Sequence, residues 1–283
     1  MFVRPGGAIT SEVRVVCAPA AQKSVELPPW WLQTGRVLTP DAFRALARSS
    51  PWRCSTAHFT HRGDGTGEVE AWLERPGTVT VRDEHGTHRW VDDPGNRGQV
   101  VVVRAYEEMP GRYPDDDPVA ADLHPPAVRA RDLTPITRDD GLVLVRPDDE
   151  SWPGAWQPYF DPDDPMYGNY RWVAMLDPRE LARGVEVSDV REVRHHGRTA
   201  WAARCVPIEG YDPRCGCCEL LWSEVSVRAE VEAGGPEPRP GTVFPEAYDV
   251  VLDHATGFVV HLVPVGESSR DDLELDVQIH SAS

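Results

Sequence analysis

Long apolar segments are missing from this sequence of 283 residues, and their absence argues against a helical membrane protein. No stretch approaches the ~20 consecutive apolar residues that a membrane-spanning helix requires. In the opening residues, MFVRPGGAITSEVRVVC, proline, glycine and charged residues interrupt every candidate apolar run, so a secretory signal is not predicted. We therefore expect a cytoplasmic protein with no transmembrane segment.

Positive charge and cysteine are also in short supply. Lysine and arginine number 29 against 46 aspartates and glutamates, which leaves a net charge of −17 that repels nucleic-acid phosphates. Six cysteines are too few for a disulfide scaffold in a chain of this length, and cytoplasmic thiols stay reduced. We expect no nucleic-acid partner and no disulfide framework.

Turn-forming residues, by contrast, are plentiful, with 27 prolines and 23 glycines. Many turns favour a β-rich fold over a helical bundle. Period-two alternation is clear in residues 68–74, where three apolar side chains share one face and Trp72 lies with glutamates on the other. Further strands, several joined by turns short enough to require antiparallel pairing, are predicted at 12–17, 78–82, 87–91, 100–106, 142–145, 185–193, 199–207, 248–252, 258–263 and 273–280.

Two segments carry helix signals. Residues 40–48 follow Thr39, a favourable N-cap, and place proline at the first helical position. Residues 170–183 contain Asp-Pro-Arg-Glu at 177–180, which has the form of a capping box. About ten strands with two helices predict an α+β fold in which a large curved antiparallel sheet, an open half-barrel, wraps about the two helices.

The predicted half-barrel domain occupies residues 39–283, after an N-terminal extension of residues 1–38. Segments rich in proline, aspartate or glycine predict long surface insertions within this domain. The insertions are placed near residues 107–140, 147–169 and 230–242.

The order of these elements resembles that of the LolA-like superfamily, which includes lipoprotein carriers and the sensing domains of some anti-sigma-factor regulators. The resemblance rests on the helix at 40–48, EVEAWLERPGTVTV at 68–81, LDPREL at 176–181, HHGRTAW at 195–201 and VLDHATGFVV at 251–260. Such proteins have an open antiparallel half-barrel around helices, often with an apolar cavity. The resemblance implies a non-enzymatic binding or regulatory protein that holds a hydrophobic small molecule or a protein segment between sheet and helices.

Tryptophan is the aromatic residue in excess, with ten in the chain. Large rings can fill the gap between a curled sheet and its helices, or they can line a ligand pocket. Two of the candidates stand three residues apart on the second predicted helix, and hence on one face. If a pocket exists, its predicted wall contains Trp172 and Met175. Trp72, on the glutamate-bearing face of its strand, is instead the candidate for an aromatic partner surface, and Trp201 completes the predicted ligand-binding residues.

A cluster of cysteines indicates an alternative function. Cys215, Cys217 and Cys218 lie close together, and Cys205 precedes the first of them by ten residues. Thiolates are soft ligands, so the four cysteines predict a site for Zn²⁺ or Cu(I), and the tight spacing suits copper better than paired zinc knuckles. A reduced turn with packed cysteines, or redox pairing, would explain the same residues. No other cofactor is predicted.

Motifs for catalysis are absent from the sequence, which has no Gly-x-Ser-x-Gly, no His-Glu-x-x-His and no Walker lysine motif. We therefore do not predict an enzyme. The histidine pairs, His195-His196 in a predicted hairpin turn among them, are interpreted as solvated loop residues. The same interpretation applies to the aspartate runs at 115–117, 139–140, 148–149 and 161–164.

Overall fold

The three-dimensional structure is a computed structural model. It describes residues 38–63, 67–91, 128–153, 160–161 and 164–283. The chain divides into two units, Met1–Val37 and Leu38–Ser283, and the described residues belong to the second. The predicted strands at 12–17 and 100–106, and most of the insertion near 107–140, lie outside the described residues.

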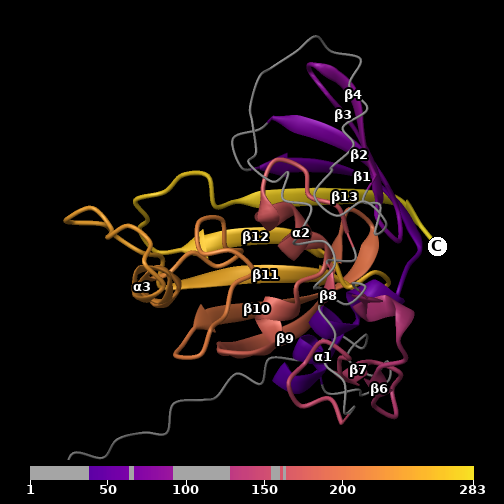
Figure 1. The fold of residues 1–283 in the computed structure, drawn as a ribbon, viewed down its shortest axis with the longest axis horizontal. Helices are drawn as coiled ribbons and strands as arrows, with labels where there is room; N and C mark the ends of the chain where they lie inside the picture. The colour runs from indigo at the N-terminus through magenta and orange to yellow at the C-terminus, as the bar shows by residue number, and fades with distance from the viewer. Residues whose placement is uncertain (1–37, 64–66, 92–127, 154–159, 162–163) are drawn as a thin grey trace, which may run out of the picture. The chain divides into compact units, whose positions relative to one another are not determined.

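Nine strands form one large antiparallel sheet, in agreement with the alternating sequence pattern (Figure 1). Their order is β4-β3-β2-β1-β13-β12-β11-β10-β9, so the sheet is open and β4 and β9 are its edges. Apart from the β1–β13 pair, strands adjacent in the sheet are consecutive in the chain. The strands are β1 (Thr56–Gly63), β2 (Glu68–Glu74), β3 (Thr78–Asp83), β4 (Gly86–Val91), β9 (Val185–His195), β10 (Arg198–Pro207), β11 (Ala247–Asp253), β12 (Val259–Val265) and β13 (Leu275–Ala282).

The pairing of β1 with β13 joins the two halves of this sheet. Phe59 lies opposite Ile279, and His61 lies opposite Val277. Beside this pair, the backbone N–H of Ser55 donates to the carbonyl oxygen of Ser283 at 2.6 Å. No hairpin turn connects the two strands, so the join follows from tertiary structure rather than from a local signal.

Burial alternates along the strands because successive side chains point to opposite faces. On β2, Val69, Ala71 and Leu73 are buried, while Trp72 lies on the other face. β13 repeats the pattern with buried Leu275, Val277 and Ile279. One face of the sheet therefore contributes to the core.

In the part of the chain that the structure describes, three α-helices accompany the sheet, namely α1 (Pro40–Ser49), α2 (Tyr170–Leu176) and α3 (Glu224–Glu232). Thr39 caps α1 as predicted, since its Oγ1 accepts from the N–H of Ala42 at 3.1 Å. The prediction of only two helices is wrong. The sequence of α3 offers no apolar face, and Ser226 is its only buried residue.

The second predicted helix is interrupted. α2 ends at Leu176, and a separate 3₁₀ turn covers Arg179–Ala182. The predicted capping box at 177–180 does not form, because the carboxylate of Asp177 accepts two bonds from the Arg146 guanidinium, at 2.6 and 3.0 Å. Two further 3₁₀ turns occupy Ser50–Trp52 and Ala130–Asp132.

The insertions contain more than surface loop. Within them, Asp148 and Asp164 are buried in ion pairs, so the interpretation of these two aspartates as solvated residues is wrong. The insertion near 230–242 begins inside α3. Two short ladders also lie here, β5 (Val128–Arg129) with β8 (Phe160–Asp161) in parallel and β6 (Ile136–Thr137) with β7 (Val143–Val145).

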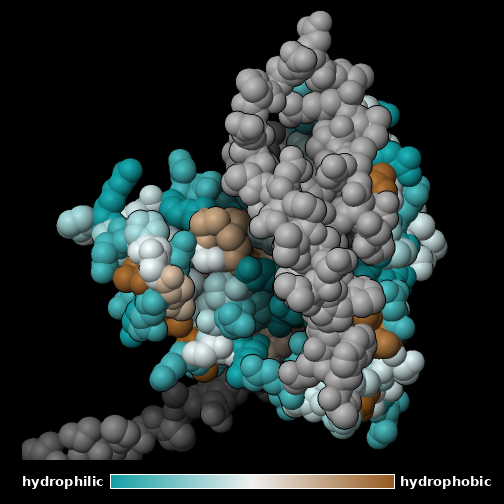
Figure 2. Space-filling view, viewed as in Figure 1, coloured by the Kyte–Doolittle hydropathy of each residue, from teal (hydrophilic) through white to brown (hydrophobic). Residues whose placement is uncertain are grey.

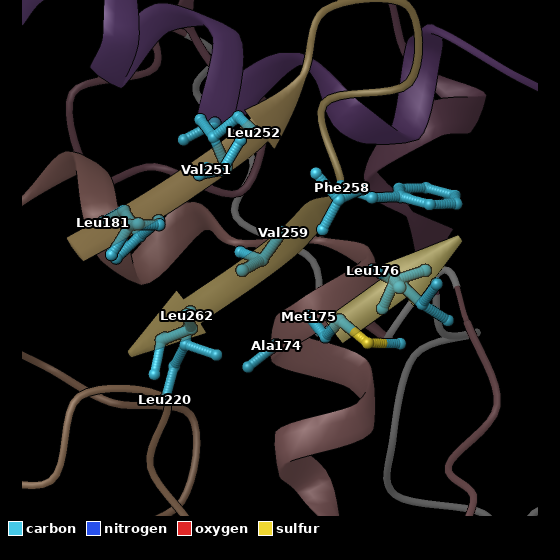
Figure 3. Packing of buried hydrophobic residues seen from close by; sticks show 14 of the residues in the cluster. Ala174, Met175, Leu176, Leu181, Leu220, Val251, Leu252, Phe258, Val259 and Leu262 are labelled. Carbon is cyan, nitrogen blue, oxygen red and sulfur yellow. The ribbon is translucent and has the colours of Figure 1, made fainter. Parts of the chain in front are cut away.

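Buried side chains of α1 and α2 join those of the sheet in one hydrophobic cluster. Figure 3 shows Ala174, Met175 and Leu176 of α2 close to Val259 and Phe258 in this cluster. Removing such apolar surface from water contributes roughly 25 cal/mol per Å² and provides the main driving force for packing the helices on the sheet.

A buried ion pair also connects the sheet with both helices. Arg75, which follows β2, donates to the two carboxylate oxygens of Asp164 at 2.7 and 2.6 Å, and both side chains are fully buried. The same guanidinium donates to the carbonyl oxygens of Ser50, after α1, and Leu176, at the end of α2. Arg75 therefore holds the ends of α1 and α2 in place relative to β2.

The exposed surface is mainly hydrophilic on the face shown in Figure 2, where the described hydrophobic residues are scattered. This is consistent with a net charge of −17. Within the described part of the chain, no helix combines the length and the apolar character needed to cross a membrane.

Candidate metal centre

The cysteine cluster lies in the segment between β10 and α3, and this segment is anchored by one buried carboxylate. Glu180, in the 3₁₀ turn after α2, accepts from the hydroxyl of Tyr211 at 2.7 Å and from the backbone N–H of Leu220 at 3.0 Å. The backbone N–H of Arg214 also donates to it, at 3.2 Å. The backbone on both sides of the three cysteines is thus held by Glu180.

A second anchor holds the residue immediately before the cysteines. The buried guanidinium of Arg214 bonds the carboxylate of Asp177, and it also donates to the Asp177 carbonyl oxygen at 3.0 Å. Asp177 is itself paired with Arg146, which in turn pairs with Asp148 at 2.7 Å. The cysteine segment therefore begins from a fixed ionic network.

The three thiols converge. The Sγ atoms of Cys215 and Cys217 are 3.0 Å apart, and those of Cys217 and Cys218 are 3.8 Å apart. Neither distance is the ~2.05 Å of a disulfide. All three Sγ atoms lie within 4.8 Å of one another, on residues that are partly or fully exposed. Two thiolates on one tetrahedral zinc ion would lie roughly 3.7 Å apart, given a Zn–S bond of about 2.3 Å.

The three thiols differ in acidity. Burial acts to raise the pKa of Cys215, but hydrogen bonds from Cys217 and Cys218 outweigh it and lower this pKa below the ordinary thiol value. The hydrogen bond to Cys215 raises the pKa of Cys217. Burial raises the pKa of Cys218 to about 12. Cys215 is therefore the first of the three to become a thiolate, which is the form that binds metal.

A carboxylate lies next to the thiols. Gly216 is packed against Glu230 of α3, so closely that a Cβ at position 216 would be 3.0 Å from the carboxyl carbon. The charge of Glu230 also contributes to the raised pKa of Cys217. Glu230 is thus close enough to act on the cluster electrostatically, and it is an oxygen donor that the sequence analysis did not identify, because it is distant in the sequence.

Cys205 does not belong to this group. It lies on β10 opposite Tyr248, is fully buried in the hydrophobic core, and is absent from the set of converging thiols. Burial raises its pKa to about 12, so it stays a protonated thiol at neutral pH. The predicted set of four cysteine ligands is therefore reduced to three by the tertiary structure.

The predicted ligand-binding residues are divided between the two faces of the sheet. Trp72 lies on the outer face of β2, stacked on His58 with ring centroids 4.8 Å apart. Trp172, Met175 and Trp201 are all buried in the hydrophobic cluster. Trp72 is thus separated from the other three by the sheet itself.

One pocket among the described residues is polar. It has a volume of about 190 Å³ and adjoins the ionic network around Arg146. Charges of both signs line it, which does not suit an apolar ligand. The lining residues include Arg48, Asp148, Asp149, Arg179 and Arg183.

Comparison with known proteins does not extend these observations. No protein-family model, no curated protein and no solved structure matches the chain. The function is therefore inferred from the site alone.

Proposed function

We propose that this chain is a metal-binding protein that holds one Cu(I) or Zn²⁺ ion on Cys215, Cys217 and Cys218. The observation that carries the proposal is the convergence of three thiols, with Sγ atoms within 4.8 Å, on an anchored segment. Thiolate sulfur is a soft donor that favours these ions over Mg²⁺ or Ca²⁺. The anchoring through Glu180 and Arg214 lowers the entropy lost when the ligands gather around a metal.

The two ions would use the site differently. Three thiolates complete a trigonal Cu(I) site, whereas Zn²⁺ requires a fourth ligand. Glu230 is the nearby carboxylate for this role, because it is packed against Gly216 between the cysteines. Its oxygens are not among the ligand atoms that lie within 4.8 Å of one another, so its side chain would have to move toward the thiols when Zn²⁺ binds. We therefore expect Glu230→Gln to weaken Zn²⁺ binding while leaving Cu(I) binding unchanged.

Metal content provides the direct test. Protein purified under reducing conditions without a chelator should contain about one equivalent of copper or zinc per chain by elemental analysis, and each single change of Cys215, Cys217 or Cys218 to serine should weaken binding more than about tenfold in competition titrations. Loss of a soft ligand from a three-thiolate site leaves too few strong donors. Co²⁺ substitution should show sulfur-to-metal charge-transfer absorption.

Cys205→Ala is the matched control, because it removes a cysteine that lies in the core rather than in the cluster. It should bind metal with the wild-type stoichiometry. Less than about a tenth of an equivalent in the native protein, with no uptake on titration, would reject the proposal.

A second candidate function is the holding of an apolar ligand between the sheet and the helices, and a group of aromatic side chains favours it. The ring of Trp172 lies 5.5 Å from Phe59, 5.4 Å from His61 and 5.1 Å from Tyr167. Its buried indole Nε1 has no hydrogen-bond partner among the described residues. In this proposal the sheet wraps about α1 and α2, as in LolA-like proteins.

Solvent extraction tests this second candidate. Mass spectrometry of the extract from purified, denatured protein should reveal a hydrophobic molecule in about equimolar amount, because a ligand buried among aromatic rings dissociates slowly. Trp172→Phe, which keeps an aromatic side chain but replaces the indole and its N–H with a smaller ring, should reduce its recovery. An extract free of any such molecule would contradict the candidate.

A further inference from the structure

A second group of potential metal ligands lies on the sheet, away from the cysteines. It consists of His195 and His196 at the β9–β10 turn and Asp276 on β13. Nε2 of His195 is 3.2 Å from Oδ1 of Asp276, and Nε2 of His196 is 3.0 Å from Oδ2. One ligand atom from each residue lies within 4.8 Å of the other two.

A third imidazole adjoins this group. His261 on β12 is paired in register with Asp276, so the two side chains project from the same face of the sheet. Nδ1 of His261 is 3.6 Å from Oδ1 of Asp276, is itself buried, and has no hydrogen-bond partner among the described residues. Its ring centroid is 5.5 Å from that of His195. His261 thus lies beside Asp276 but outside the set of ligand atoms within 4.8 Å of one another, and its side chain would have to move to become a fourth ligand.

The β9–β10 hairpin must bend to reach β13, because β11 and β12 lie between them in the sheet. The register of β9 with β10 shifts between Ala202 and Arg204, which marks a β-bulge. Asp189, on the bulged side, has a φ of 53°. A bulge bends its strand and re-aims the residues beyond it. The bulge in β9 thus lets the end of the hairpin approach β13, where Nε2 of His195 lies 3.2 Å from the carbonyl oxygen of Val277.

The turn itself places His196 in an unusual conformation. His196 and Gly197 have φ values of 44° and 81°, as a type I′ turn requires at its two central positions. Asn-Gly is the favoured sequence there, since a side chain in the left-handed region costs energy for most residues. The histidine at this position points its Nε2 at Asp276, and this is the contact that the strained conformation secures.

We propose that His195, His196, His261 and Asp276 form a second metal site, for a borderline divalent ion such as Zn²⁺. Imidazole nitrogen and carboxylate oxygen are the donors that this class of ion prefers. A neutral histidine binds the metal through its unprotonated ring nitrogen, so it does not have to lose a proton first. Arg62 lies 3.6 Å from Oδ2 of Asp276 but is closer to Glu68, at 2.6 Å, so it has another carboxylate partner when metal binds. The site is independent of the thiol cluster, and either proposal can fail alone.

The test uses the full chain with Cys215, Cys217 and Cys218 changed to serine, so that the thiol cluster cannot contribute. After treatment with a chelator, this protein is titrated with Co²⁺ and, in competition with a chromophoric indicator, with Zn²⁺. We expect about one equivalent of each ion, and visible Co²⁺ absorption without sulfur charge transfer. Binding should also raise the thermal unfolding midpoint.

Two substitutions in this background remove ligands without disturbing the backbone that holds them. Asp276→Asn removes the charge, and His196→Asn installs the residue that type I′ turns favour, so the hairpin should fold at least as well. Each should weaken binding more than about tenfold. His280→Gln changes another histidine on β13, one that contacts Thr60 instead of the group, and should bind as the background protein does.

The outcomes separate cleanly. Stoichiometric binding that is lost in Asp276→Asn and His196→Asn but kept in His280→Gln supports the site. Absence of binding, or binding that all three variants retain equally, overturns it, and the hydrogen bonds of His195 with Val277 and of His196 with Asp276 then serve only to fasten the hairpin to β13.

Discussion

Replacing Asp177 with asparagine should lower the free energy of unfolding by about 3–5 kcal/mol, the range for removing one partner of a buried ion pair. Asp177 is 3% exposed and its carboxylate bonds both Arg146 and Arg214. Asparagine keeps the shape but not the charge. Two buried guanidinium groups would therefore lose their common counter-ion.

The pKa of Asp177 supports the same expectation. Burial acts to raise this pKa, but the charges of Arg146 and Arg214 outweigh it and hold the pKa well below the usual range. A carboxyl group whose pKa is lower in the folded state stabilises the fold above its unfolded pKa of about 3.9, and this contribution is lost as the pH falls through the folded value. The difference in the free energy of unfolding between wild type and Asp177→Asn should accordingly be largest near pH 7 and become smaller in acid.

Urea denaturation followed by tryptophan fluorescence measures the effect. Asp177→Asn should unfold at a lower urea concentration than wild type, with the same dependence of the free energy of unfolding on urea concentration. Asp249→Asn is the control, because the Arg204–Asp249 pair lies on the surface, with side chains 38% and 41% exposed. Its midpoint should hardly move. An equally small shift for Asp177→Asn would show that the ionic network does not stabilise the fold, and the anchoring assigned to Arg214 would fail with it.

Acidification from pH 7 to pH 4 should cost the wild-type protein about 3 kcal/mol of stability through His61 alone. His61 is 2% exposed on the inner face of β1, beside the ring of Trp172. Burial, and then the charge of Arg171, lower its pKa to about 4, against a smaller opposing effect of Asp276.

The sign follows from proton linkage. The unfolded chain binds a proton at His61 below pH about 6.5, whereas the folded protein does so only near its lowered pKa. Protonation of His61 therefore favours the unfolded state between these two pH values. The contribution of neutral His61 to the free energy of unfolding is fully present above pH about 6.5 and declines as the pH approaches 4.

His61→Leu should remove this decline while leaving the contributions of other groups in place. Unfolding free energies from urea titrations between pH 4 and pH 7, in the presence of a chelator, provide the measurement. His280→Gln, which removes an exposed histidine from β13, is the control and should keep the wild-type profile. Parallel pH profiles for wild type and His61→Leu would contradict the expectation.

Local signals in the sequence predicted most of the hairpins and one helix. The alternation of Val69, Ala71 and Leu73 placed β2 correctly and assigned Trp72 to its outer face. Thr39 and Pro40 marked the start of α1. These features depend on residues within a few positions of one another, which is the range over which period and capping act.

Predictions failed where distant residues decided the outcome. The motif at 177–180 has the residues of a capping box, but Asp177 is used by Arg146 and Arg214. Asp164 appears in a run typical of a solvated loop, yet Arg75, 89 residues away in the chain, pairs with it in the interior. Composition indicates charge, but it does not indicate which charges find a buried partner.

The two candidate metal sites show the same division. Sequence alone determined the antiparallel hairpins, α1 and the thiol cluster, because Cys215, Cys217 and Cys218 are near neighbours in the chain and must stay close in any fold. Only the tertiary structure decided that Cys205 is in the core, that β1 joins β13, and that His196 meets Asp276 across a separation of 80 residues. Such contacts depend on strand register and on the bend at a bulge, which are set by the packing of the whole sheet.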